Sequence, residues 1–249
     1  MDKKVVGLAA RDLAFLKNSK KRLFYVKGGK VYSFDGEGAE RSVYAFVPSG
    51  DSLFSSDILE NRILHSESFK EIRKTKEKGL LGIAVKRERN AFGEKLLVSH
   101  PNLRKKIEIP LSEPGMGGDY DVERVVKFVE SKKRGNVFEA VFSGPYMEEL
   151  LSNSVSSKYV ITIKKDEEGA YRLGFPTMHG AEETIIPYEC LVYVGETFPD
   201  VVSLNLSFPL SMAKSLKDEI SYIRISIGKR SNGEYVEAEM EGLRAVYGR

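Results

Sequence analysis

Cysteine, histidine and tryptophan are scarce in this chain of 249 residues, which has one cysteine, three histidines and no tryptophan. The single thiol, Cys190, excludes an internal disulfide framework and fits a reducing compartment. The histidines His65, His100 and His179 are isolated from one another and from Cys190. The sequence therefore contains no spacing typical of a metal site, and we expect neither a metal nor a cofactor.

Long apolar runs and a strong charge of one sign are also lacking. We find no run long enough to span a bilayer and no signal peptide, so we expect no membrane association. The net charge of +3, from 39 basic and 36 acidic residues, is too small to direct the whole molecule towards nucleic acid. Any attraction to a polyanion must come from segregation of the charges.

Catalytic patterns are missing as well. Gly28 and Gly29 lie between two strand-like segments and lack the spacing of a phosphate-binding loop. Cys190 lies in an apolar segment and fits a core position better than a nucleophile. We therefore expect that the protein is not an enzyme. The alternative is a β-rich hydrolase, with carboxylates from distant strands, or a binding protein unrelated to DNA.

Short segments with apolar and polar residues in alternation make up most of the chain, and they predict half-buried antiparallel strands. Helices are few, so the fold class is α+β. Gly28 and Gly29 predict a tight hairpin turn. In the first part of the chain we expect helices at 8–21 and 66–79, and strands at 22–27, 30–36, 41–48, 59–65, 80–88, 94–99 and 104–111.

The segment SESFKEIRKTKEKG, residues 66–79, predicts a helix with a basic side. Ser66 can cap its first turn and Gly79 can end it in the left-handed conformation. Phe69 and Ile72 form its apolar side. Three cations fall in one row roughly opposite: Lys70, Lys74 and Lys78. The row suits a polyanion, but the glutamates among these cations favour an ordinary solvated surface when this helix is considered alone.

A break in the pattern at 112–135, rich in glycine and charge, predicts a connector between two domains, 1–111 and 136–249. Its valines, Val122, Val125, Val126 and Val129, have helical spacing, but β-branched residues disfavour a helix. We therefore expect an extended or loosely helical strap. The second part predicts helices at 143–153 and 208–221, strands at 136–142, 183–194 and 201–207, a hairpin at 158–176 and three final strands.

The order of elements in the second part repeats that of the first, which predicts an internal duplication. The helices of the two halves then place their apolar residues in equivalent positions. The equivalent pairs are Leu13 with Met147, Leu16 with Leu150, Phe69 with Leu210, and Ile72 with Ala213.

This twofold order resembles the DNA sliding clamps of the proliferating cell nuclear antigen type, over essentially the whole chain. The segments that carry the resemblance are RILHSESFKEIRKTKEKG, VFEAVFSGPYMEELLSNSVSSKYVITIKKDEEG and YIRISIGKRSNGEYVEAEMEGLRAVYGR. The resemblance implies the duplicated clamp fold, with two helices on antiparallel sheets in each domain. Three subunits would then form a pseudo-sixfold ring.

The function that the resemblance implies is that of a processivity factor, which encircles double-stranded DNA without reading its sequence. The implied partners are a DNA polymerase, other replication and repair proteins with clamp-binding peptides, a separate ATP-dependent loader, and two further copies of the chain. The implied location is cytoplasmic or nucleoid, or nuclear in a eukaryotic host. The alternative is a clamp-fold processivity or checkpoint factor that works as a monomer, dimer or mixed ring.

The resemblance also implies three sets of site residues. The candidates that face DNA are Arg11, Lys17, Lys20, Lys21, Lys70, Arg73, Lys74, Lys78, Lys214 and Lys217. The candidates for a partner-peptide pocket are Phe34, Val125, Val126, Phe128, Val246 and Tyr247. The candidates for the subunit interface, on two expected edge strands, are Ile107, Ile109, Tyr171, Leu173 and Phe175. Core packing is the alternative for each member of the last two sets. The second domain offers few cations on its helices, so the charge would be asymmetric.

Overall fold

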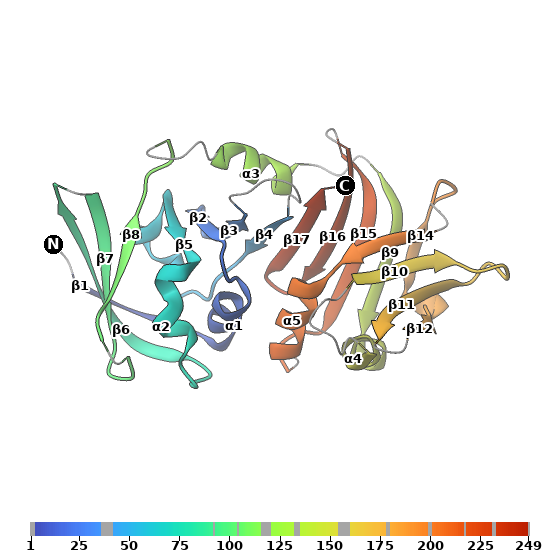
Figure 1. Cartoon of the computed structure of the whole chain (residues 1–249), viewed down its shortest axis with the longest axis horizontal. Coiled ribbons are helices and arrows are strands. Elements are labelled where there is room, and N and C mark those ends of the chain that lie inside the picture. Colours follow the sequence, from blue (N-terminus) through green and yellow to red (C-terminus); the bar gives the residue numbers. More distant parts are fainter. Residues whose placement is uncertain are drawn as a thin grey trace. The chain divides into compact units, whose positions relative to one another are not determined.

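The computed structural model of the chain divides into two compact units, Met1–Glu130 and Ser131–Arg249 (Figure 1). The residues that the structure describes are 3–35, 42–91, 93–103, 105–115, 121–131, 135–153, 160–177, 180–198, 201–216, 218–230 and 233–248. No helix within these ranges has the length and apolar character needed to cross a membrane.

The first unit contains two groups of antiparallel strands. One has the order β1(Lys3–Leu8), β6(Leu80–Asn90), β7(Gly93–Ser99), β8(Ile107–Leu111). In the other the order is β4(Ser42–Phe46), β3(Lys30–Phe34), β2(Leu23–Lys27), β5(Arg62–His65). The helices are α1(Ala10–Asn18), α2(Lys70–Arg73) and α3(Val122–Glu130), and short 3-10 turns lie at η1(Leu53–Ser55), η2(Asp57–Leu59) and η3(Ser66–Phe69). Helices α1 and α2 pack against each other.

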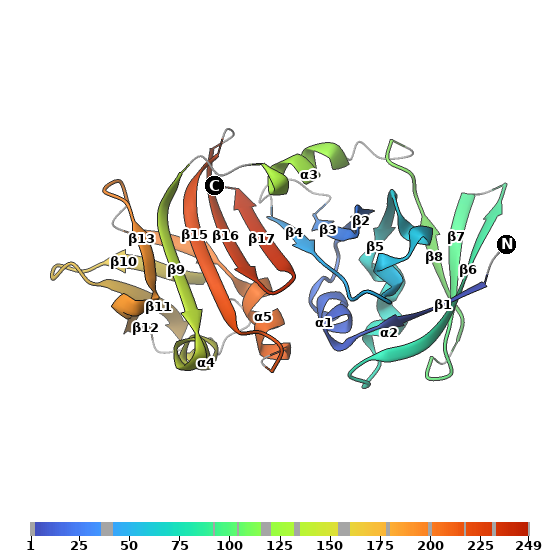
Figure 2. The ribbon, with the colours of Figure 1, turned by 180° about the vertical axis from the view of Figure 1, so that it is seen from behind.

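The second unit has the same plan. One group of strands has the order β12(Gly180–Ile185), β11(Tyr171–Thr177), β10(Val160–Lys165), β14(Val201–Asn205). The other has the order β13(Leu191–Val194), β9(Asn136–Ser143), β15(Tyr222–Arg230), β16(Gly233–Met240), β17(Leu243–Gly248) (Figure 2). Helices α4(Gly144–Asn153) and α5(Ser207–Ser215) pack against each other, and a 3-10 turn lies at η4(Tyr188–Cys190).

The predicted equivalence of the two halves is confirmed in the core. In each unit the two packed helices are anchored by apolar side chains at the expected positions, and all eight of these side chains are buried. They are Leu13, Leu16, Phe69 and Ile72 in the first unit, and Met147, Leu150, Leu210 and Ala213 in the second.

Aromatic rings fill the core of the first unit beneath these helices. Phe15 of α1 stacks on Phe46 of β4 with ring centroids 4.4 Å apart. Phe24 and Phe54 meet edge to face at 6.1 Å, and Phe69 lies 5.6 Å from Phe54. Rings at such distances attract each other beyond the area that they bury, so this cluster joins the helices to strands β2 and β4.

The predicted helix at 66–79 is much shorter in the structure. A 3-10 turn at Ser66–Phe69 leads into α2, which ends at Arg73. Ser66 does not cap this helix, because its hydroxyl accepts the N–H of Arg22 at 2.8 Å. Beyond Ile72 the segment contributes no apolar side chain to the core, so no apolar burial offsets the entropy of a longer helix. The expected row of three lysines on one helix is therefore wrong.

Gly79 is not the left-handed helix end that the sequence predicts, since it lacks a positive φ. A Cβ atom at this position would lie 3.2 Å from the carbonyl oxygen of Leu8. The glycine is needed for the close approach of this segment to β1. Strand β1 itself was not predicted, because the first element expected from the sequence was the helix that begins at Leu8.

The predicted long strand at 183–194 is two strands in the structure, β12 and β13, which belong to different groups. Between them lie Pro187, which has no N–H to donate to a ladder, and the 3-10 turn η4. The hairpin at Gly28 and Gly29 is confirmed, with φ angles of +58° and +72°.

An ion-pair cluster joins β5 to the β6–β7 hairpin. Glu94 accepts a hydrogen bond from Arg62 Nε at 3.0 Å and another from Arg87 Nε. Arg62 Nη2 also lies 3.4 Å from an oxygen of Glu113. The side chain of Glu94 is only 13% exposed. The hydrogen bond from Arg87, supported by that from Arg62, lowers the pKa of the Glu94 carboxyl group.

We predict that replacing Glu94 by Gln lowers the free energy of unfolding by about 1–2 kcal/mol at neutral pH. A carboxyl group whose pKa is lower in the folded state stabilises the fold above its unfolded pKa of about 4.3, and this stabilisation is lost as the pH falls through the folded value. Urea unfolding of both proteins at pH 7 and pH 3 measures the effect. The difference should shrink towards pH 3, and a pH-independent difference would contradict the assignment. The control is Glu88→Gln, whose side chain is more exposed than that of Glu94, and it should have a smaller effect.

Candidate functional site

Two basic segments of the first unit meet at Glu67. The turn after α1 contributes Lys20 and Lys21, and the backbone N–H of Lys21 donates to the Glu67 carboxylate at 3.3 Å. Arg73 of α2 donates to the same oxygen from Nη2 at 3.0 Å. The hydrogen bond from Arg73 lowers the pKa of Glu67, with a further contribution from the charge of Lys70. Glu67 therefore holds the end of α1 beside α2.

The candidate DNA-facing cations differ in their exposure. Arg11 and Lys17 are half-buried, and the guanidinium of Arg11 lies 5.7 Å from the ring centre of Phe46. The side chain of Arg73 is only 8% exposed and is bound to Glu67, so it positions the segment more than it presents charge. Lys217 lies outside the described residues. The exposed candidates are Lys20, Lys21, Lys70, Lys74, Lys78 and Lys214.

Exposed cations near α2, Lys105 among them, are absent from the candidates predicted from the sequence. Lys74 donates to Glu71 at 2.9 Å, and this hydrogen bond lowers the pKa of Glu71. The charge of Lys105 also lowers the pKa of Glu71, so Lys105 lies close to α2 although it precedes β8. The run Lys105-Lys106 was the available signal. We name the exposed set Lys20, Lys21, Lys70, Lys74 and Lys105 the basic surface.

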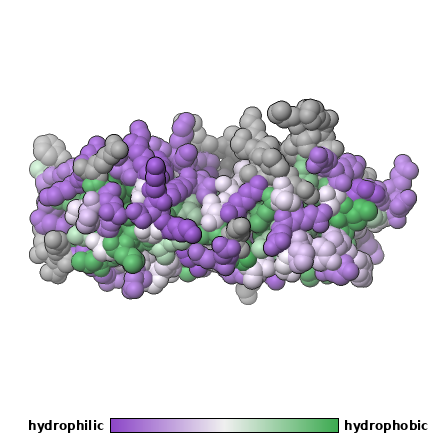
Figure 3. Space-filling model, turned by 90° about the horizontal axis from the view of Figure 1, so that it is seen from below, coloured by the Kyte–Doolittle hydropathy of each residue, from purple (hydrophilic) through white to green (hydrophobic). Residues whose placement is uncertain are grey.

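The second unit has no equivalent of the basic surface on its described helices. The sequence of α4 contains no lysine or arginine, and its Glu148 and Glu149 are exposed. On α5 the exposed cation within the described residues is Lys214. Figure 3 views the molecule from below and shows hydrophilic side chains interspersed with small apolar areas.

The connector contains a regular helix, α3, where we expected an extended or loosely helical strap. Asp121 begins it, because its carboxylate accepts the N–H of Arg124 at 2.9 Å and its carbonyl accepts the N–H of Val125 at 3.1 Å. Val122 and Val129 are buried. This cap and this burial outweigh the helix penalty of the β-branched residues, which is below about 0.7 kcal/mol for each of them.

Helix α3 is fastened to β2 and β3 by its two terminal glutamates. Lys27 pairs with Glu123 at 2.6 Å and Lys30 pairs with Glu130 at 2.8 Å. The hydroxyl of Tyr32 donates to the same Glu130 oxygen at 3.0 Å. Burial, together with Glu130, raises the pKa of Tyr32 well above its ordinary value. Tyr32 therefore stays a donor, and Glu130 is the stronger of the two fastening points.

The candidate peptide-pocket residues lie in two different units. In the first unit Val125, Val126 and Phe128 of α3 are half-buried, so part of each side chain is accessible, whereas Phe34 is buried. In the second unit Val246 is buried and Tyr247 is half-buried. The accessible part of this set in the first unit therefore belongs to α3.

One of the two expected edge strands is wrong. Strand β8 does end the order of its group, but β11 pairs with β10 on one side and β12 on the other. The edge is the short strand β12, which the sequence pattern merged into a longer strand. The candidate interface side chains also point inward: Tyr171 is half-buried, and the buried ones are Ile107, Ile109, Leu173 and Phe175. The exposed residues of β8 are Glu108 and Pro110.

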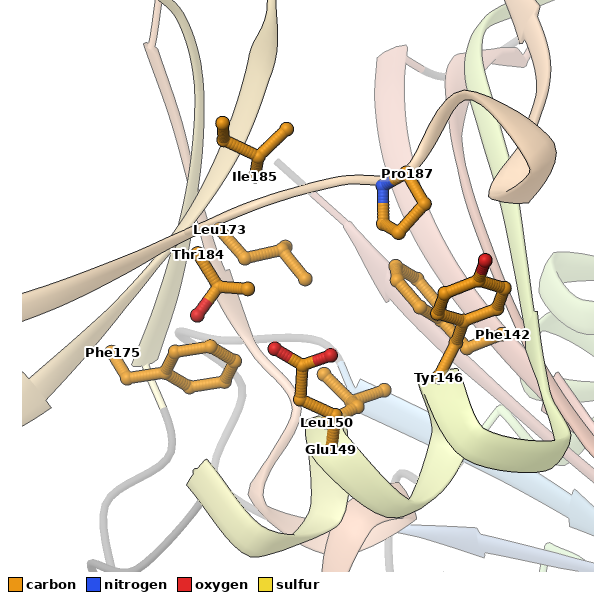
Figure 4. Close-up of a pocket in the computed structure, with 9 residues that line it drawn as sticks. All are labelled: Phe142, Tyr146, Glu149, Leu150, Leu173, Phe175, Thr184, Ile185 and Pro187. Carbon is orange, nitrogen blue, oxygen red and sulfur yellow. The ribbon is translucent and has the colours of Figure 1, made fainter.

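A recess lies beside the β12 edge, with about 270 Å³ of space that is open to solvent. Its lining is mainly apolar, and the Glu149 carboxylate points into it (Figure 4). The lining residues are Phe142, Tyr146, Glu149, Leu150, Leu173, Phe175, Thr184, Ile185 and Pro187. Among the described residues, no group of three or more acidic, histidine or cysteine side chains could hold a metal ion.

These two similar units, each with two packed helices on antiparallel strands, have the fold of the DNA sliding clamps. The DNA polymerase sliding clamp from Bacillus subtilis matches with a TM-score of 0.57 at 12% identity, over 98% of this chain and 63% of that one. PCNA from A. fulgidus, solved with the C-terminal region of FEN-1, matches with a TM-score of 0.55 at 11% identity, over 98% and 96%. The PCNA2-PCNA3 complex from Sulfolobus tokodaii matches with a TM-score of 0.55 at 13% identity, over 98% and 97%.

The chain thus spans less than two thirds of the B. subtilis clamp and nearly all of the A. fulgidus protein. No protein-family model matches the sequence, and no curated protein matches it. The recognition of a clamp fold and the fold class predicted from the sequence are confirmed by these structural matches.

We predict that Glu130→Ala loosens α3, because it removes the acceptor shared by Lys30 and Tyr32. The amide protons of residues 122–130 should exchange roughly fivefold faster, which corresponds to about 1 kcal/mol of local stability. Hydrogen exchange followed by mass spectrometry measures this change. Glu123→Ala is the matched control at the other end of the helix, with a more exposed ion pair, and should have less effect. Equal exchange in wild type and Glu130→Ala would contradict the fastening role.

Proposed function

We propose that this protein is a sliding clamp, a processivity factor that encircles duplex DNA and tethers replication and repair enzymes. The observation that carries the proposal is the clamp fold, which extends over 98% of the chain. In this proposal the chain binds and positions other molecules and is not itself an enzyme.

The basic surface supports a sequence-independent contact with DNA. Its lysines come from the turn after α1, from α2 and from the segment before β8, and their exposed ammonium groups can approach phosphates from several directions. Contacts between lysine and phosphate do not select a base sequence, and salt ions readily replace them. Such contacts allow a protein to move along the duplex.

The two strand edges support assembly of identical subunits, and three copies would close a ring. Strands β8 and β12 each end the order of their group, and open edges are normally paired or protected. Lys105 and Lys106 precede β8, which itself carries Glu108, whereas β12 carries Glu182 and Glu183, so unlike charges lie at the start of the β8 edge and on the β12 edge. A head-to-tail contact between unlike surfaces generates rings.

Partner peptides would dock on the first unit beside α3, where Val125, Val126 and Phe128 are partly accessible. A short helical peptide buries apolar anchors in a groove of this kind. We propose a DNA polymerase and other replication proteins as the partners. A separate ATP-dependent loader would open the ring.

A second candidate is a clamp-fold factor that works as a monomer, a dimer or a mixed ring. Two observations favour it. Pro110 in β8 lacks an N–H and weakens that edge for pairing with another strand. The basic surface has no counterpart on the described helices of the second unit, where α4 presents Glu148 and Glu149. A mixed ring would place subunits of different charge around the DNA.

We predict that the triple variant Lys20→Ala, Lys70→Ala, Lys74→Ala weakens DNA binding about tenfold and reduces the salt dependence of log K by up to about 2.7, since each lost phosphate contact removes about 0.9 from the slope. Anisotropy with a duplex of unrelated sequence, measured across salt concentrations, tests this.

The matched control removes three exposed cations elsewhere in the first unit, Arg89, Arg124 and Lys127. It should leave binding nearly unchanged. Equal losses in both triple variants would show a diffuse attraction and contradict a DNA-binding role for the basic surface.

We predict a mass of three times 27.9 kDa in solution. Replacing Glu182 and Glu183 by Lys should dissociate the assembly, and mixing this variant with Lys105→Glu, Lys106→Glu should restore an edge contact between unlike chains. Light scattering over a wide concentration range measures each mass. Glu77→Lys is the exposed acidic control. A constant mass of 27.9 kDa would contradict the ring of identical subunits and favour the second candidate.

A further inference from the structure

Strand β13 and the turn before it form an exposed apolar ridge on the second unit. The side chains of Tyr188, Val192 and Tyr193 are 87%, 59% and 49% exposed. They fall within six consecutive residues, and Glu189 and Glu196 accompany them. We name Tyr188, Val192, Tyr193, Glu189 and Glu196 the β13 ridge. Grouped apolar exposure of this kind is typical of a binding surface, whereas isolated exposed apolar residues are ordinary.

The backbone of β13 is also open on one side. Among the described strands β13 pairs with β9, and it ends the order of its group (Figure 2). The ladder shifts register between Leu191 and Tyr193, at the position of Val192. Of the features that protect an edge, β13 has a short length and this register shift, but neither proline nor lysine. An added strand would therefore find free hydrogen-bonding groups beside two exposed side chains.

The stretch of sequence that contains the ridge has charge of one sign. Residues 173–213 contain no lysine or arginine and five acidic residues, although the whole chain has 39 basic residues in 249. Glu183 in this segment pairs with Lys164. Glu189 and Glu196 have no ion-pair partner within the described residues, and both are exposed. The exposed carboxylates of Glu189 and Glu196 therefore favour a cationic partner over nucleic acid.

We propose that the β13 ridge is a docking site for an extended, basic segment of another protein. The segment adds a strand to the free edge of β13, and its main-chain hydrogen bonds provide affinity. Its lysine or arginine side chains lay their apolar stems over Val192 and Tyr193 and place their charges near Glu189 and Glu196. A cation over the ring of Tyr188 gains a further attraction.

A second copy of the chain fits the site less well. The stretch KNSKKRLFYVKGGK, residues 17–30, has six basic residues and no acidic one, but it includes β2, which is paired with β3 and β5 and held by the buried side chains of Leu23, Phe24 and Val26. It would have to leave this sheet and its core to pair with β13. The ridge is also distinct from the β8 and β12 edges and from the basic surface, so this proposal does not depend on the clamp function.

The test uses the full chain and a fluorescein-labelled peptide of nine residues in which Lys alternates with Val. We expect saturable binding with a Kd below about 1 mM, weakened by salt. A peptide with Glu in place of each Lys should bind at least about tenfold more weakly, because like charges then face each other. A peptide with Pro in place of each Val should also lose binding, because it cannot form a strand.

Variants of exposed side chains locate the site without threatening the fold. Tyr188→Ala combined with Val192→Ala should weaken binding about tenfold, and Glu189→Gln with Glu196→Gln about fivefold. The matched control is Leu81→Ala, which removes an 80% exposed apolar side chain from the first unit and should change nothing. Bound peptide should slow amide exchange of residues 191–194.

Three results would overturn the proposal. The first is no binding of the basic peptide at a concentration of about 1 mM. The second is binding that the ridge variants and Leu81→Ala affect equally. The third is a concentration-dependent mass that Tyr188→Ala with Val192→Ala abolishes, since this would make a second copy the occupant. None of these measurements includes DNA, so failure here is separate from failure of the clamp function.

Discussion

The packing of two short helices against open-edged strands, twice in the chain, is the constraint on which the rest of the structure depends. Helix α2 has four residues and α1 nine, lengths at which a helix has little stability of its own in water. Each helix is therefore held by buried anchors such as Leu13 with Leu16, or Phe69 with Ile72. The side of each helix that faces the core must stay apolar. The side that faces solvent can carry either charge, and the charges on that side are the main difference between the two units.

Apolar periodicity accounts for the part of the fold that could be predicted from the sequence. The eight anchor positions, the Gly28-Gly29 hairpin and most strands could be read directly, because burial imposes a regular pattern on the residues that it selects. The length of the predicted helix at 66–79 was overestimated because it, too, was inferred from the residue pattern. Its caps and charges are compatible with a long helix, but only the tertiary core decides where the last buried side chain lies, and that is Ile72.

The predicted sites depended on information that periodicity does not contain. Whether β11 or β12 ends its group depends on pairing between strands distant in sequence, so the edge was placed one strand too early. Helix α3 formed despite its valines because Asp121, Lys30 and Tyr32 provide polar contacts from outside the helix. Lys105 joined the basic surface because the fold brings it close to Glu71. Each of these contacts connects residues that no local pattern links.

Charge segregation explains how a nearly neutral chain can serve two kinds of partner. The net charge of +3 conceals a first unit with exposed lysines around α2 and a second unit with 41 consecutive residues, 173–213, free of lysine and arginine. Screening limits the reach of exposed charges to about 10 Å at moderate salt, so each surface acts mainly on the ligand that it contacts. In the two proposals a polyanion binds the lysines of the first unit and a cationic segment binds β13 of the second. The two surfaces share no residue, so each has its own variants and the two proposals can be judged separately.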